Sequence, residues 1–174
     1  MPNATNNPSW GKPGIYVKNL DDASPAWVKI PTPVEDSTQL VPTAGDSIDA
    51  TVEGGEVEAS RRKASSYELS YAIRYLAGRT MPMEHTNGVV SGHYAVALIP
   101  EDPTAPGFCI QNSTVGAEDP YNCADGSNWT YRHKVLKPSS GKMVKWGTIT
   151  ATESQGAISI TGQGGDFGET AVNL

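Results

Sequence analysis

The residues best suited to chemistry in this chain are its histidines, its cysteines and a few adjacent acids. His93, His133 and Cys123 carry donor atoms that zinc accepts, but none of them has the spacing of a helical ligand pair or stands beside a cysteine pair. The pairs Glu101–Asp102 and Glu118–Asp119 are bracketed by proline or glycine, which is typical of solvated turns. No phosphate-binding loop, calcium loop or nucleophile elbow occurs. We therefore expect no enzyme activity, no metal and no cofactor.

The two cysteines do not make a disulfide framework. Cys109 and Cys123 could face each other across a hairpin and form one disulfide. The N-terminus has neither a basic start nor an apolar segment, so we expect no export signal and favour two ordinary thiols. No apolar run approaches the length of a membrane helix, so we expect no membrane segment.

Charge is unevenly distributed along the 174 residues, whose net charge is −6. Residues 1–60 hold three cations and nine acids, whereas residues 61–174 are balanced. One part of the molecule should therefore project a negative field, and stable binding of nucleic acid through its phosphates is not expected.

The clearest structural pattern in the sequence is that of a β-hairpin. Ser47–Glu53 alternates apolar and polar residues, Gly54-Gly55 predicts a two-residue turn, and the return strand from Glu56 alternates as well. One face should be apolar and the other acidic, with the acids Asp49, Glu53, Glu56 and Glu58. A basic turn should follow, formed by Arg61, Arg62 and Lys63. Taken alone, this pattern also fits the solvated side of a half-buried sheet.

The other elements are short and β-type. Ser65–Leu76 alternates strictly and is rich in tyrosine, which favours a strand, although a helix would also gather an apolar stripe. About eight strands separated by regular turn signals predict an all-β fold, an antiparallel β-sandwich or small barrel. We expect an extended N-terminal arm at 1–14, a sandwich domain at 15–150 with a long loop at 31–46, and a glycine-rich C-terminal arm at 151–174.

Three segments together resemble tail tube proteins of long-tailed bacteriophages, particularly those of Bacteroidales phages and prophages. The segments are Pro42–Val57, Gly88–Gly107 and Ala124–Lys145, and the resemblance spans roughly residues 27–148. The most specific elements are Pro-Glu-Asp-Pro-Thr…Pro-Gly-Phe and Leu-Lys-Pro…Gly-Lys. The resemblance implies a β-sandwich that assembles with itself into hexameric rings, which stack into a tube and join other tail proteins. It implies a virion protein made in the bacterial cytoplasm, and usually a helix packed against the sandwich.

A DNA channel must not hold the duplex, so an acidic lining suits it. If the resemblance holds, Asp49, Glu53, Glu56 and Glu58 are candidates to line the channel, with the apolar side of their hairpin against the sandwich core. A competing placement puts the hairpin tip between rings, where Arg61, Arg62 and Lys63 of the next ring would meet the acids. A tail terminator, connector or head decoration protein would share the same sandwich. A carbohydrate-binding or adhesin module would use the tryptophans instead.

Overall fold

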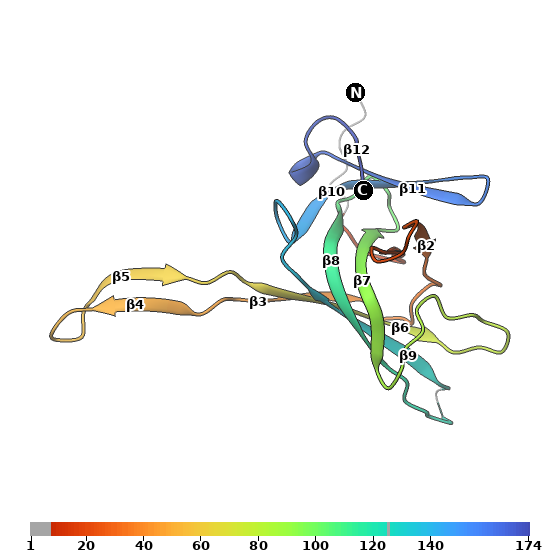
Figure 1. Ribbon diagram of the computed structural model, residues 1–174, viewed down its shortest axis with the longest axis horizontal. Coiled ribbons are helices and arrows are strands. Elements are labelled where there is room, and N and C mark those ends of the chain that lie inside the picture. Colours follow the sequence, from red (N-terminus) through yellow and green to blue (C-terminus); the bar gives the residue numbers. More distant parts are fainter. Residues whose placement is uncertain (1–7, 125) are drawn as a thin grey trace.

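The computed structural model describes residues 8–124 and 126–174, and it is all-β (Figure 1). Its one helical element in these residues is the 3-10 turn η1 at Gly165–Phe167. None of the described helical residues forms a segment with the length and hydropathy that a membrane crossing requires. The strands are β1 Gly14–Asn19, β2 Trp27–Lys29, β3 Gln39–Thr43, β4 Ser47–Thr51, β5 Val57–Arg62, β6 Ser66–Arg74, β7 Val89–Ile99, β8 Gly107–Glu118, β9 Asn128–Val135, β10 Val144–Ser154, β11 Ala157–Gln163 and β12 Val172–Asn173.

Strands β7 and β8 form the centre of an antiparallel, sandwich-like body. On one side β7 pairs with β1, which pairs with β2. On the other side β8 is shared, because its first residues pair with β10 and its later residues pair with β9. The sheet therefore forks at β8, with β10–β11–β12 on one branch and β9–β6–β3 on the other. The sandwich-like all-β fold agrees with the prediction from the sequence.

The main core lies between the β7–β8 centre and the β9–β6 branch. Tyr71 and Tyr131 are fully buried, with their ring centroids 5.8 Å apart. Alternate residues of β9, Tyr131, His133 and Val135, are all buried, so one face of this strand enters the core. Other large members of this core are Ile15, Val17, Ile30, Leu69, Ile73, Met83, Val96 and Ile110.

A second apolar cluster covers the opposite face of β7 and β8, and it corrects the expectation of a poorly packed C-terminal arm. Residues 151–174 complete β10 and form β11, η1 and β12, and Ile160 is 2% exposed. The ring of Phe167 lies so close to Gly147 and Gly162 that a Cβ on either glycine would stand under 3 Å from it. At the other end of the chain, residues 8–13 contain no strand, and residues 1–7 of the expected arm lie outside the described residues.

Ser65–Leu76 contains the strand β6 at Ser66–Arg74, so the helix alternative is wrong. The helix that the resemblance implies is not present among residues 8–124 and 126–174. The expected loop at 31–46 also needs correction, because β3 lies within it and pairs with β6 from Gln39↔Ser70 to Thr43↔Ser66. Pro42 is tolerated in β3 because the strand has β6 on one side and is otherwise an edge.

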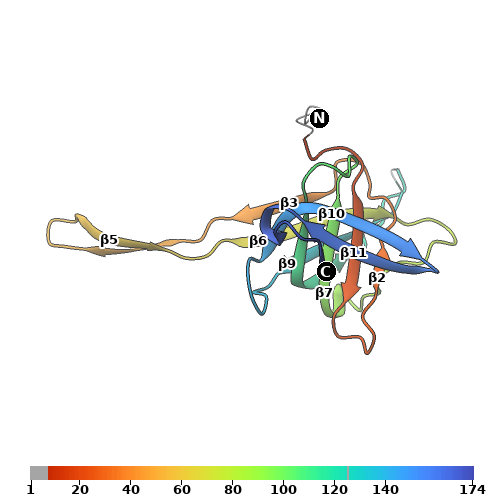
Figure 2. The same cartoon turned by 90° about the horizontal axis from the view of Figure 1, so that it is seen from above.

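Strands β4 and β5 form a separate two-stranded sheet that projects far from the body, as both views show (Figures 1 and 2). Every residue of both strands is exposed. The hairpin continues the β3–β6 pair, so the rigid body determines the direction in which it points. We call Ser47–Arg62, with its turn, the projecting hairpin.

Candidate functional site

The projecting hairpin is joined to the body at a short, tightly packed root. The amide of Lys63 donates a hydrogen bond of 2.9 Å to the carbonyl of Asp46, which closes the hairpin below β4 and β5. Gly45 lies against the backbone of Lys63 and Ala64, and a Cβ there would overlap the carbonyl oxygen of Lys63. Glycine is therefore needed at the root, where the ladder passes from β3–β6 to β4–β5.

The tip of the hairpin is a three-residue turn, not the predicted two-residue one. The amide of Val52 bonds to the carbonyl of Glu56, so Glu53, Gly54 and Gly55 lie between the paired residues. Gly54 and Gly55 have φ angles of 94° and 84°, which only glycine adopts without strain. The two glycines thus have the predicted role, but Glu53 belongs to the turn rather than to a strand.

The pairing register shows which side chains share a face of the hairpin. Ile48 pairs with Arg61, and Ala50 pairs with Ala59, so these four side chains lie on one face. Asp49 pairs with Ser60 on the other face, and the Ser60 hydroxyl donates a hydrogen bond to the Asp49 carboxylate. The register shifts between Ala50 and Thr51, and Glu58 is the extra residue of this bulge. The predicted strict alternation therefore holds only below the bulge.

No residue that the structure describes covers the apolar side chains of the hairpin. Ile48 and Val57 are each 55% exposed and Val52 is 41% exposed. The hypothesis that this apolar side packs against the sandwich core of its own chain is therefore wrong. The physical reason is that the hairpin extends away from the body, so its core-forming pattern lacks a core within one copy.

The predicted charged residues lie together on this hairpin. Asp49 and Glu58 are in strands, Glu53 is in the turn at the tip, and Glu56 follows that turn. The predicted basic turn is instead the end of β5, since Arg61 and Arg62 are strand residues, with Lys63 directly after them. Within the described residues, no ion pair includes any of these seven side chains. Glu53 and Glu56 therefore lie at the outer end of the hairpin and the three cations at its root, with Asp49 and Glu58 between them.

The residues considered for metal or acid chemistry do not form a common site. His133 is buried in the core, where burial lowers its pKa to about 3, whereas His93 is exposed and lies 2.9 Å from Asp21. Cys123 is exposed and Cys109 is buried, and both are free thiols. No group of three potential metal-binding side chains occurs among residues 8–124 and 126–174.

The adjacent acidic pairs have structural partners. Asp102 accepts hydrogen bonds from the amide and hydroxyl of Thr104, in the manner of a turn residue. Glu118 lies 3.3 Å from Arg132, and Asp119 lies 3.5 Å from the ring of His85. These contacts fit the interpretation of both pairs as turn and strand-end residues.

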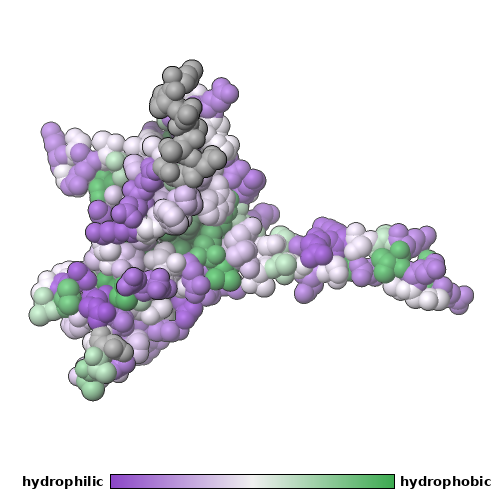
Figure 3. Space-filling model, turned by 180° about the vertical axis from the view of Figure 1, so that it is seen from behind, coloured by the Kyte–Doolittle hydropathy of each residue, from purple (hydrophilic) through white to green (hydrophobic). Residues whose placement is uncertain are grey.

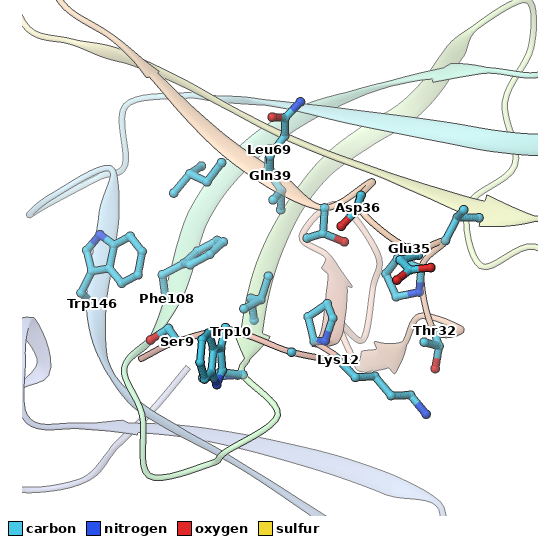
Figure 4. Close-up of a pocket in the computed structure, with 18 residues that line it drawn as sticks. Ser9, Trp10, Lys12, Thr32, Glu35, Asp36, Gln39, Leu69, Phe108 and Trp146 are labelled. Carbon is cyan, nitrogen blue, oxygen red and sulfur yellow. The ribbon is translucent and has the colours of Figure 1, made fainter. Parts of the chain in front are cut away.

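An open groove of about 750 Å³, which no sequence pattern predicted, lies on the body where β3 begins (Figure 4). Trp10 and Trp146 lie along it, and Leu40, Leu98 and Phe108 provide apolar side chains. Figure 3 shows hydrophobic surface at the centre of this face of the body, next to the point where the hairpin leaves it. The groove is built from segments distant in the sequence, so no local pattern could have indicated it. We call it the tryptophan groove.

No family model matches the chain, and no curated protein matches it.

Proposed function

We propose that this chain is a virion structural protein that polymerises with itself into stacked rings, six subunits to a ring, and so forms a phage tail tube. The projecting hairpin is the observation that carries the proposal. A two-stranded ribbon is only marginally stable alone in water, and this one exposes Ile48, Val52 and Val57 on both sides of its bulge. Contacts with other copies of the chain would cover these side chains and stabilise the hairpin.

The open edges of β4 and β5 support self-association. Among residues 8–124 and 126–174 each strand pairs only with the other, so each presents one row of unpaired backbone groups along its outer edge. Proteins normally shorten, charge or cover such edges, because an open edge is a template for another strand. Closing hairpins from several copies into one barrel satisfies every edge at once.

The acids of the hairpin suit the lining of a channel for DNA. Asp49, Glu53, Glu56 and Glu58 are exposed and have no described cationic partner within the chain. A lining of lysine and arginine would hold the duplex by neutralising phosphates, whereas carboxylates repel phosphates and leave the DNA mobile. In this arrangement the acids face the bore.

The second candidate position for the hairpin is between stacked rings. The acids of the tip would then meet Arg61, Arg62 and Lys63 of a neighbouring ring. Glu53 and Glu56 lie at or beside the tip, away from the cations at the root, and this separation supports the arrangement as well. Reversing the charge of the acids distinguishes the two positions. If the acids line the channel, tubes should still form but DNA should not pass. If the acids lie between rings, the rings should no longer stack into tubes.

Negative-stain microscopy of the purified protein tests the proposed function. Long hollow tubes support it, and single rings would indicate a terminator or connector instead. Trimers would indicate a decoration protein. A protein that stays monomeric at every concentration would contradict the whole proposal.

A further inference from the structure

We propose that the tryptophan groove of one copy receives the root half of the projecting hairpin of a second copy. This inference rests on the proposed function and deepens it, because it names the surface that holds the hairpin. The groove is an open concave surface, and the hairpin is an exposed projecting element of the same chain. The groove could cover the hairpin, and the hairpin could fill the groove.

The groove offers an apolar floor of the size that a few side chains of a β-strand need. Leu69 and Phe108 are buried below it, Leu40 and Leu98 are half-buried, and Trp146 is 44% exposed. Large apolar side chains left open to water on a concave surface are typical of binding surfaces. Trp10, which is 73% exposed, extends this surface from the N-terminal side.

The hairpin offers a matching face near its root. Ile48, Ala50 and Ala59 form an apolar strip on that face, and Arg61 is directly opposite Ile48 in the register. Inserting Ile48 into an apolar groove would therefore place the guanidinium of Arg61 at the rim of the groove. Removing an exposed isoleucine side chain from water is favourable, which supports the apolar part of the contact.

The charges of the two surfaces are complementary. Glu35 and Asp36 are exposed at one end of the groove, away from Trp146, as Figure 4 shows. Lys12 is the cation among the residues that line the groove, so its lining has a net negative charge. Arg61 of an incoming hairpin would meet this acidic end, and such complementarity fixes the register of a contact.

The hairpin of the same chain does not occupy the groove. β4 and β5 extend outward from the body in both views, and all their residues are exposed (Figures 1 and 2). A contact in which each copy donates one surface and receives another is heterologous, and it propagates into a closed ring or a filament. The inferred contact therefore produces the kind of assembly that the proposed function requires.

Directed disulfide formation tests this inference. All variants carry Cys123→Ser, because Cys123 is exposed, while Cys109 is buried and stays. The donor copy carries Ile48→Cys and the acceptor copy carries Gln39→Cys, an exposed position in the lining of the groove. The control acceptor carries Val89→Cys, which is 65% exposed and lies outside that lining.

We expect about tenfold more mixed disulfide with Gln39→Cys than with Val89→Cys, because docking raises the effective concentration of the two thiols. Equal yields would overturn the inference. Donor copies that cross-link mainly with one another through Ile48→Cys would also overturn it, since the hairpins would then pair among themselves.

A charge exchange provides a second test without cysteines. Arg61→Glu should weaken association, measured by sedimentation velocity, and Glu35→Arg in the same chain should restore it. If tubes form but neither the cross-link nor the rescue occurs, the inference fails and the proposed function stands. If the unmodified protein never associates, both fail.

Discussion

The hydroxyl of Tyr71 lies 2.9 Å from Nε2 of His133 at the centre of the core, and neither side chain is exposed to solvent. The other ring nitrogen, Nδ1, is 3.2 Å from the hydroxyl of Ser113, which itself donates a hydrogen bond to the carbonyl of Tyr94. Because the Ser113 proton is used in that bond, Nδ1 of His133 carries the ring proton and Nε2 accepts from Tyr71. The neutral imidazole therefore satisfies the buried hydroxyls of both Tyr71 and Ser113.

This arrangement predicts a loss of stability in mild acid. Burial lowers the pKa of His133 from 6.5 to about 3, so between these values the unfolded chain binds a proton that the folded chain does not. Stability from this group is complete above pH 6.5 and is lost as the pH falls toward 3. Its contribution to the free energy of unfolding should fall by about 1.4 kcal/mol per pH unit in that window. Urea unfolding at a series of pH values measures it.

The matched control is His133→Gln, which keeps hydrogen-bonding groups but does not titrate. The variant should be less stable at pH 7, and its free energy of unfolding should depend less steeply on pH between 6.5 and 4. Equal slopes for the two proteins would show that other groups cause the acid sensitivity.

Substitution by alanine should affect stability very differently at Gly107 and at Gly116, which both lie in β8. A Cβ on Gly107 would overlap the carbonyl oxygen of Leu98, whereas the nearest atom to a Cβ on Gly116 is 3.6 Å away. Gly107→Ala should therefore lower the free energy of unfolding by about 2 kcal/mol or more, because the backbone of β7 must move. Gly116→Ala should change it by less than about 0.5 kcal/mol. Denaturant unfolding of both variants checks this, and similar values would contradict the close packing of Gly107.

The two thiols should react at very different rates. Burial raises the pKa of Cys109 to about 11, and the side chain is 3% exposed, whereas Cys123 is exposed. A thiol-specific chromogenic reagent at pH 8 should therefore modify one thiol of the native protein and two after unfolding. Cys123→Ser should abolish the native reaction. Rapid modification of the variant would show that Cys109 is accessible.

Local patterns in the sequence were sufficient for some elements. The alternation in Ser65–Leu76 predicted β6 because the two faces of that strand lie in different environments. Leu69, Tyr71 and Ile73, on one face, are all fully buried. The hairpin was also predicted, because its glycines and its alternating strands are local signals. Local signals could not show that its apolar side is left uncovered by every described residue of the same chain.

Other features depend on contacts between distant residues. The C-terminal segment has few large apolar residues, yet Phe167 packs on Gly147 and Gly162, where a side chain would overlap its ring. Pro42 obscured β3, since proline argues against a strand unless the strand is an edge. The tryptophan groove likewise needs Trp10 and Trp146, which no sequence period connects.

Charge reversal on the hairpin distinguishes its two proposed positions. Replacing Asp49, Glu53, Glu56 and Glu58 by lysine should leave the fold intact, because all four are exposed. If they line the channel, tubes should still form, but DNA ejection should be slow or blocked, since lysines bind phosphates. If they lie between rings, tube growth itself should stop. Normal tubes with normal ejection would exclude both positions. The matched control exchanges aspartate for glutamate and glutamate for aspartate at the same four sites, which keeps the charge.

Removal of the projecting hairpin should separate folding from assembly. The amide of Lys63 already bonds to the carbonyl of Asp46, so an Asn-Gly turn can join these two residues in place of 47–62. Since β4 and β5 form their own sheet and bury nothing, the free energy of unfolding should change by less than about 0.5 kcal/mol. The shortened protein should nevertheless remain monomeric in sedimentation velocity, because it lacks both the open strand edges and the apolar face. Tubes formed without the hairpin would mean that the body alone carries the assembly contacts, and that the exposed face of Ile48 and Ala50 has a different purpose.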